Sequence, residues 1–152
     1  MLILDSNHVD VIMFEYPRCD NLLRRINAAR EHTVHTTIIT VQENLEGWLS
    51  KVNGRQLTPA RQVPYYDNIS KLILFFGKWD VLPFNEAAAV EFTWLQSLRL
   101  GPIGTNDLKI AAIANCHNAI ILTRNTKDFR RTTLMPTQDW LQDDPSDALI
   151  GE

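Results

Sequence analysis

Four carboxylates stand out because each follows or opens a segment that should deliver it to one edge of a sheet. Asp5 and Asp128 lie shortly after apolar runs, Glu43 follows a β-branched run, and Asp107 lies near a helix start. Carboxylates gathered in this number are the hard oxygen ligands that Mg²⁺ and Mn²⁺ prefer. The sequence lacks the paired Cys and His spacing of a zinc site. It therefore predicts a site for Mg²⁺ or Mn²⁺.

The segments that carry these acids are predicted to alternate between strands and helices. Strands are expected in the apolar or β-branched runs 2–4, 36–41, 81–84 and 119–122. Amphipathic spacing predicts helices over 21–30, 42–52, 67–76, 86–100 and 104–118, with loops over 54–64 and 123–128. Asp67 and Asn85 are the expected N-caps of two of these helices, and Asn118 is expected to end another in a left-handed conformation. Such alternation predicts an α/β fold, a parallel sheet with helices on both faces.

Sheet topology turns the scattered acids into one hypothesis. The carboxyl ends of parallel strands lie at one edge, and function collects there where the strand order reverses. Asp5, Glu43 and Asp128 are expected at that edge, and Asp107 joins them from a helix N-terminus, which stabilises negative charge. Taken alone, Asp5 could be a helix cap, Glu43 and Asp107 could be first-turn acids that interact with a helix dipole, and Asp128 could start a turn. Only a shared site accounts for all four together.

Polar and basic residues surround the acids. Hydroxyl and amide side chains that could orient them or hold water are Ser6, Asn7, Thr105, Asn106, Thr123 and Asn125. Their alternative role is ordinary capping and turn formation. The basic residues that flank Asp128 are Arg124, Lys127, Arg130 and Arg131. They are predicted to contact a polyanion backbone, or else to form a solvated face.

Composition limits the possible classes of protein. A chain of 152 residues with 45% hydrophobic content predicts one globular domain over residues 1–142, and the acidic segment 143–152 is expected to fray. The longest apolar run is too short for a bilayer, so we expect no membrane contact and a cytoplasmic location. Cys19 and Cys116 are expected to be reduced packing residues. The net charge of −3 leaves room only for local, metal-assisted binding of nucleic acid.

Four segments in this order resemble the PIN-domain ribonucleases, and among these the VapC-type toxins of bacterial toxin–antitoxin pairs. The segments are Ile3–Asn7, Thr37–Glu43, Gly104–Ala114 and Leu122–Phe129. The resemblance runs from Met1 to about Leu141. It implies a three-layer fold with a central parallel sheet of about five strands flanked by helices. It also implies an acidic pocket that binds Mg²⁺ or Mn²⁺ and hydrolyses the phosphodiester bonds of single-stranded RNA.

The resemblance assigns roles residue by residue. Asp5, Glu43 and Asp107 match the three principal acids of the family and Asp128 the fourth, while Asn125 occupies a position where members have an acid or an amide. Asp5, Asp107 and Asp128 are the predicted metal ligands. Glu43 is expected to position the attacking water or to complete the metal shell.

The resemblance also implies partners. VapC-type proteins form homodimers and are inhibited by a small VapB-like antitoxin whose C-terminal segment lies along the helices. Apolar surface on the helix after Glu43 and around Tyr65 and Tyr66 is the expected docking place, and core packing is the alternative for those residues. The identity of the RNA and the number of metals stay open.

Two rival functions remain. A phosphoryl-transfer enzyme with an aspartyl nucleophile would share the fold, but its common form has a second Asp two residues after the first, where Asn7 stands. The other rival is a non-catalytic PIN-like module that binds RNA or a protein. Four intact acids argue against that module, and a metal titration would separate the two.

Overall fold

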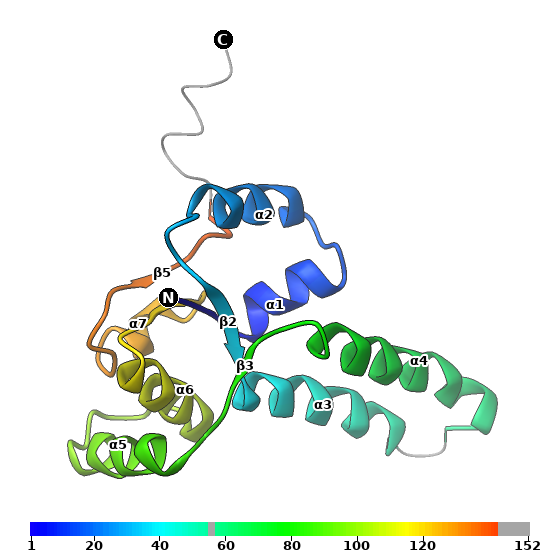
Figure 1. Cartoon of the computed structure of the whole chain (residues 1–152). Helices are drawn as coiled ribbons and strands as arrows, with labels where there is room; N and C mark the ends of the chain where they lie inside the picture. Colours follow the sequence, from blue (N-terminus) through cyan, green and yellow to red (C-terminus); the bar gives the residue numbers. More distant parts are fainter. Residues whose placement is uncertain (55–56, 143–152) are drawn as a thin grey trace.

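A computed structural model describes residues 1–54 and 57–142 and contains a parallel sheet (Figure 1). Within the described residues the sheet has five strands in the order β3-β2-β1-β4-β5, and every neighbouring pair is parallel. The strands are β1 (Leu2–Leu4), β2 (Val34–Thr37), β3 (Val81–Leu82), β4 (Ile120–Leu122) and β5 (Thr137–Gln138). The chain fills one half of the sheet outward from β1 and then returns to fill the other half from β4. The order therefore reverses between β1 and β4.

Helices cover both faces of this sheet, which confirms the predicted three-layer α/β fold (Figure 1). They are α1 (Ser6–Met13), α2 (Cys19–Ala28), α3 (Ile38–Val52), α4 (Pro59–Phe76), α5 (Glu86–Ser97), α6 (Thr105–Cys116) and α7 (Thr126–Phe129). Side chains alternate across β1: Ile3 packs into a core with α5 and α6, whereas Leu2 and Leu4 pack with α1, α2 and α4. In Figure 1, α3 and α4 extend as a hairpin to one side of the sheet.

Several predicted element boundaries were wrong, most of all those at the starts of α3 and α4. β2 ends at Thr37 and not at Val41, because the Thr37 side chain accepts the backbone N–H of Thr40 at 3.1 Å and starts α3. Burial of Ile39 and Thr40 against the sheet overrides the β preference of these branched residues. The predicted loop over 54–64 becomes helical from Pro59, eight residues before the expected Asp67 cap. Proline suits this first helical position.

Some of the other predictions about helix ends and cysteines were confirmed, and others were wrong. Asn85 caps α5 as predicted, with its Oδ1 accepting the Ala88 N–H at 3.0 Å, and Asn118 has the predicted left-handed φ of 48°. Helices α1 and α7 and strand β5 were not predicted. Cys116 is exposed, so its predicted packing role is wrong, and Cys19 is half-buried. The segment expected to fray, 143–152, lies outside the described residues.

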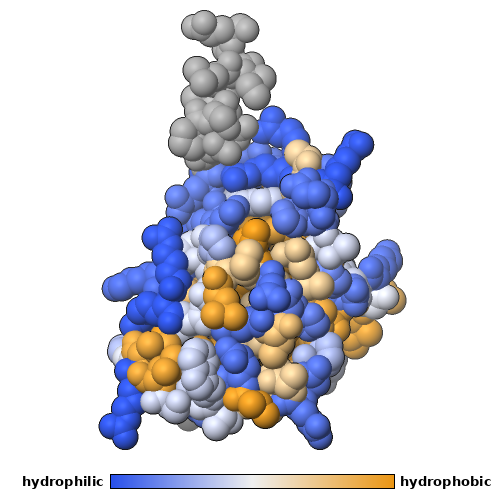
Figure 2. All heavy atoms as spheres, turned by 60° about the vertical axis from the view of Figure 1, so that its left-hand side comes forward, coloured by the Kyte–Doolittle hydropathy of each residue, from blue (hydrophilic) through white to orange (hydrophobic). Residues whose placement is uncertain are grey.

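The surface shows how the sequence distributes its apolar residues. Figure 2 brings forward the side of the molecule that lies on the left in Figure 1, and there apolar residues form small patches between hydrophilic ones. None of the helices in the described ranges is long and apolar enough to cross a membrane.

Candidate active site

The carboxylate of Asp5 lies where the sheet reverses its strand order. Asp5 directly follows β1 and is only 5% exposed. Its Oδ1 accepts the Ser6 backbone N–H at 2.7 Å, and its Oδ2 accepts the hydroxyl of Thr123, which follows β4, at 2.8 Å. Both donors are neutral. They fix the orientation of the carboxylate without balancing its charge, an unfavourable state for a buried ion.

Glu43 reaches the same edge from α3. The Ser6 hydroxyl donates to Glu43 Oε2 at 2.5 Å, so Ser6 contacts Asp5 through its backbone and Glu43 through its side chain. Because α3 begins at Ile38, Glu43 lies beyond the first turn. The alternative that Glu43 serves the helix dipole as a first-turn acid therefore loses its basis.

Asn125 connects the remaining two acids. Its side-chain amide donates to Asp107 Oδ2 at 3.0 Å and to Asp128 Oδ2 at 3.2 Å, and its backbone N–H donates to the Thr123 hydroxyl oxygen at 2.9 Å. Asp107 lies in the first turn of α6, as predicted, and Asp128 lies in α7. The four acids are thus joined into one network through Ser6, Thr123 and Asn125.

The acids of this network differ in their proton affinity. Burial raises the pKa of Asp5, and Glu43 adds to the rise. Burial, followed by the charges of Asp5, Glu43 and Asp128, raises the pKa of Asp107 to about 6. Hydrogen bonds from Arg131, at 2.6 Å, and Asn125 instead lower the pKa of Asp128. Asp5, Glu43 and Asp128 are therefore close enough to Asp107 to raise its pKa. Asp128 differs from the other acids because it is already paired with the Arg131 guanidinium.

The donor set fits a divalent cation chemically, although the described side chains do not close around one. In the described part of the chain, no group of three or more His, Cys, Asp and Glu residues is arranged to hold a metal ion. Neutral donors from Ser6, Thr123 and Asn125 occupy the carboxylate oxygens instead. Repulsion between neighbouring carboxylates raises their pKa values, and a bound cation would relieve that repulsion.

Comparisons with known proteins agree with this geometry. The family model of the PIN domain matches residues 2–134. The chain belongs to the PIN domain family. Among curated relatives, Ribonuclease VapC1 of Haemophilus influenzae (strain R2866) is 37% identical over 79 residues, 50% of this chain and 59% of the relative. The tRNA(fMet)-specific endonuclease VapC of Shigella flexneri is 34% identical over 76 residues, 48% of this chain and 58% of the relative. Each match thus spans less than two thirds of the relative's length.

Solved structures extend the likeness along the chain. VapBC2 from Rickettsia felis, bound to a DNA fragment from its promoter, matches with a TM-score of 0.71 at 22% identity, over 91% of this chain and 98% of that one. VapBC-1 from nontypeable Haemophilus influenzae matches with a TM-score of 0.64 at 27% identity, over 93% and 98%. The likeness in fold thus covers more than nine tenths of this chain.

The flanking residues of this PIN domain divide into two groups. Ser6, Thr123 and Asn125 contact the acids as described. Asn7 and Thr105 are exposed, and neither makes a hydrogen bond to the four acids in the described structure. Arg131 is committed to Asp128 and to the Leu100 carbonyl at 2.6 Å. The predicted phosphate contacts Arg124, Lys127 and Arg130 are exposed beside the network.

Asp10 belongs to this region but was missed from the sequence. It lies one helical turn after Ser6 on α1 and lines the same cleft as Glu43. Burial, followed by the charges of Asp5 and Glu43, raises its pKa to about 6. The i, i+4 spacing from Ser6 would have located it, had a helix been predicted after Asp5.

His8 is a structural residue of α1. It is fully buried on α1, and its Nε2 accepts the Trp140 backbone N–H at 3.1 Å. Burial lowers its pKa to about 4. His8 therefore stays neutral near pH 7 and anchors the segment after β5 against α1.

Proposed function

We propose that this PIN domain is a metal-dependent endoribonuclease and the toxin of a VapBC-type toxin–antitoxin pair. The observation that carries the proposal is the network in which Asp5, Glu43, Asp107 and Asp128 meet at the strand-order reversal. Curated relatives carry the names ribonuclease and tRNA(fMet)-specific endonuclease. Action on cellular RNA would place the protein in the cytoplasm.

In this proposal Asp5, Asp107 and Asp128 hold Mg²⁺ or Mn²⁺, with Asp5 and Asp107 contributing most. A bound divalent cation supplies Lewis-acid chemistry and neutralises negative charge on the phosphate. Ser6 and Thr123 keep the Asp5 carboxylate in one orientation through its two oxygens. Asn125 donates to both Asp107 and Asp128 and so fixes these two carboxylates relative to each other.

Glu43 is the proposed base. Its Oε2 accepts a hydrogen bond from the Ser6 hydroxyl. This bond holds the Glu43 side chain beside Asp5. From there Glu43 would orient the water that attacks phosphorus and accept its proton. The exposed Arg124, Lys127 and Arg130 would contact neighbouring phosphates of the RNA.

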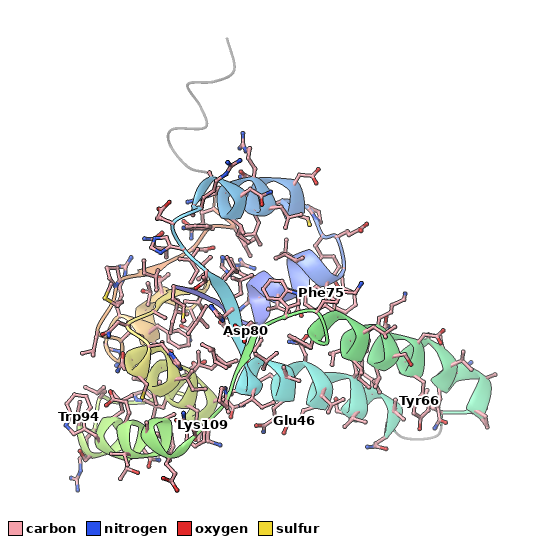
Figure 3. All side chains as sticks on the ribbon, viewed as in Figure 1. Glu46, Tyr66, Phe75, Asp80, Trp94 and Lys109 are labelled. Atoms are coloured by element: carbon pink, nitrogen blue, oxygen red, sulfur yellow. The ribbon has the colours of Figure 1, made fainter. Side chains whose placement is uncertain are left out.

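The α3–α4 hairpin is the proposed docking surface for a second copy and for a VapB-like antitoxin. Leu49 on α3 and Val63, Tyr66, Ile73 and Leu74 on α4 are all exposed. Figure 3 shows Tyr66 far out along the hairpin, away from the sheet. Apolar surface of this extent on a projecting element is typical of a protein interface. The solved VapBC structures named above are complexes of this toxin–antitoxin type.

Metal-dependent cleavage of RNA tests the proposal. We expect the purified chain to cleave single-stranded RNA in Mg²⁺ or Mn²⁺, to stop in EDTA, and to resume when either cation is returned in excess. Asp5→Asn should abolish this cleavage, whereas Asp128→Asn, which removes an acid already paired with Arg131, should reduce it only in part. Undiminished cleavage in EDTA, or none with either cation, would contradict the proposal. The second outcome, combined with RNA binding, would favour the non-catalytic module.

A further inference from the structure

A cleft of about 280 Å³ opens between α1 and α3, directly beside the acidic network. Ser6 and Glu43 belong to both the network and the cleft. From Ser6 the cleft follows α1 through Asp10 to Phe14, and from Glu43 it follows α3 through Gly47 to Lys51. The i, i+4 spacing of these residues places each set along one face of its helix. A ligand in the cleft would therefore adjoin the site of the proposed chemistry.

Aromatic rings line this cleft in a row. Phe14 and Tyr16 are stacked, with ring centroids 5.4 Å apart and planes at 28°. Phe14 also contacts Trp48, with centroids 5.7 Å apart. Tyr16 is 50% exposed. Half-exposed aromatic rings that line an open cleft are the surfaces on which proteins stack the bases of single-stranded nucleic acids.

Gly47 leaves the cleft open. It lies in the interior of α3, where glycine is unfavourable relative to alanine. A Cβ added at Gly47 would meet nothing within 4 Å, so packing within the described residues does not require glycine there. Any side chain at this position would enter the cleft between Glu43 and Lys51. The missing side chain thus keeps space next to the acids.

Charged groups complete the cleft. The Lys51 ammonium lies 3.9 Å from the centroid of the Trp48 ring at the end away from Glu43, where it could pair with a phosphate. Asp10 has a buried Oδ1 without a hydrogen-bond partner among the described residues. Asp10 also lines the cleft, so its carboxylate can accept a hydrogen bond from a ligand there. An ionised carboxylate accepts hydrogen bonds but cannot donate them.

We propose that the cleft at Gly47 binds one nucleobase of the RNA next to the scissile phosphate. The base stacks on the Phe14–Tyr16 row, Lys51 contacts a flanking phosphate, and Asp10 accepts from an exocyclic amino group. Adenine, cytosine and guanine carry such a group and uracil does not, so uracil is disfavoured in the cleft. The inference rests on the proposed ribonuclease function, because it takes RNA as the ligand.

The test fills the cleft without removing any group that lines it. Gly47→Trp projects a bulky ring into the cleft, and Gly47→Ala is the matched control because it changes the helix backbone in the same way. The probes are a short labelled single-stranded RNA of mixed sequence and the same chain with abasic residues. Binding in Mg²⁺ is read by stopped-flow anisotropy before turnover, after circular dichroism has shown that both variants are folded.

Wild type and Gly47→Ala are expected to bind the base-containing RNA about 5- to 100-fold more tightly than the abasic chain. Gly47→Trp is expected to bind both alike. Tyr16→Ala, which truncates an exposed ring, should reduce the difference. If Gly47→Trp keeps the preference for bases, or if wild type shows none, the inference is overturned. A Gly47→Trp variant that weakens only antitoxin binding would assign the cleft to the antitoxin and overturn it as well.

The same experiment separates this inference from the proposed function. Base-dependent binding without hydrolysis would leave the nucleobase cleft standing while the ribonuclease proposal fails. Hydrolysis without base-dependent binding would do the opposite. For the contact to Asp10, a random RNA pool is cleaved and its ends are sequenced: wild type should disfavour uracil at one position beside the cut, and Asp10→Asn should lose that bias. An unbiased wild-type pool would overturn the role of Asp10.

Discussion

Asp5 and Asp128 are the same residue type at the same edge of the sheet, yet their surroundings differ in two ways. Asp5 is buried and accepts hydrogen bonds from neutral donors, so burial raises its pKa. Asp128 is partly exposed and paired with the Arg131 guanidinium, so its pKa is lowered. Among the described residues, Asp5 therefore has no cationic hydrogen-bond partner, whereas Asp128 already has one. Asp107 resembles Asp5, because its pKa is raised by burial and by neighbouring acids.

The largest predicted difference between the two regions is in catalysis. Asp5→Asn or Asp107→Asn should lower the initial rate of metal-dependent RNA cleavage by at least about 100-fold, since each removes a proposed ligand worth several kcal/mol. Asp128→Asn should lower it by less than about tenfold. Initial rates on one RNA, with circular dichroism as the control for folding, check this ranking. Equal losses in all three variants would remove the distinction between the regions.

Thermal unfolding should show the same division through metal binding. At about 100 times its Kd, a cation that binds only the folded state adds about 2.7 kcal/mol, which corresponds to a rise in Tm of about 5–10 °C for a domain of this size. We expect this rise with Mn²⁺ in wild type and Asp128→Asn, and its loss in Asp5→Asn. A full rise in Tm for folded Asp5→Asn would show that the metal does not depend on Asp5 for binding.

Asp107 should make the free energy of unfolding depend on pH. Its folded pKa of about 6 lies above the ordinary value of 3.8, so the folded state binds the proton more tightly than the unfolded state does. Without metal, its ionisation should therefore reduce the free energy of unfolding as the pH rises from about 4 to about 6, by about 1 kcal/mol after solvent screening. Asp107→Asn should remove that loss, as denaturant unfolding at several pH values would show. At a cation concentration below saturation, cleavage should fall as the pH drops below about 6, because protonation of Asp107 competes with cation binding.

The smallest expected effect lies at the exposed region. Arg131→Gln removes the cation beside Asp128 and should let the pKa of Asp128 return toward its ordinary value. Because exposed ion pairs contribute little, the cleavage rate should change by less than about fivefold. Titration of Asp128 by NMR and the initial rate measure the two consequences. A large loss of cleavage would show that Arg131 contacts the RNA directly.

The convergence of the four acids could be predicted because it depends on strand ends and on sheet topology. Asp5 follows an apolar run, Leu2–Leu4, that is typical of a buried parallel strand. Asn125 was predicted to orient the acids, but which of the acids it contacts could not be predicted in the same way. Its contacts with Asp107 and Asp128 depend on the short helix α7, whose four residues carry no periodic pattern.

The cleft between α1 and α3 could not be predicted from the sequence for a different reason. Helix α1 was not predicted, because its buried face includes His8, a polar residue that is satisfied by the backbone of Trp140 far along the chain. When α1 is not predicted, Asp10 and Phe14 are not placed on one helix face. Gly47 then has no expected effect except a lower stability of its helix. Tertiary contacts between distant segments decide such positions, and no local sequence pattern contains them.

RNA ends mapped in cells that express wild type or Asp5→Asn would test the central claim most directly, because the buried acid is the residue on which the proposed site depends. With wild type, new ends should accumulate at a defined site in a cellular RNA. With Asp5→Asn, expressed to the same level and folded, those ends should be missing. The same ends in both cultures would contradict the account.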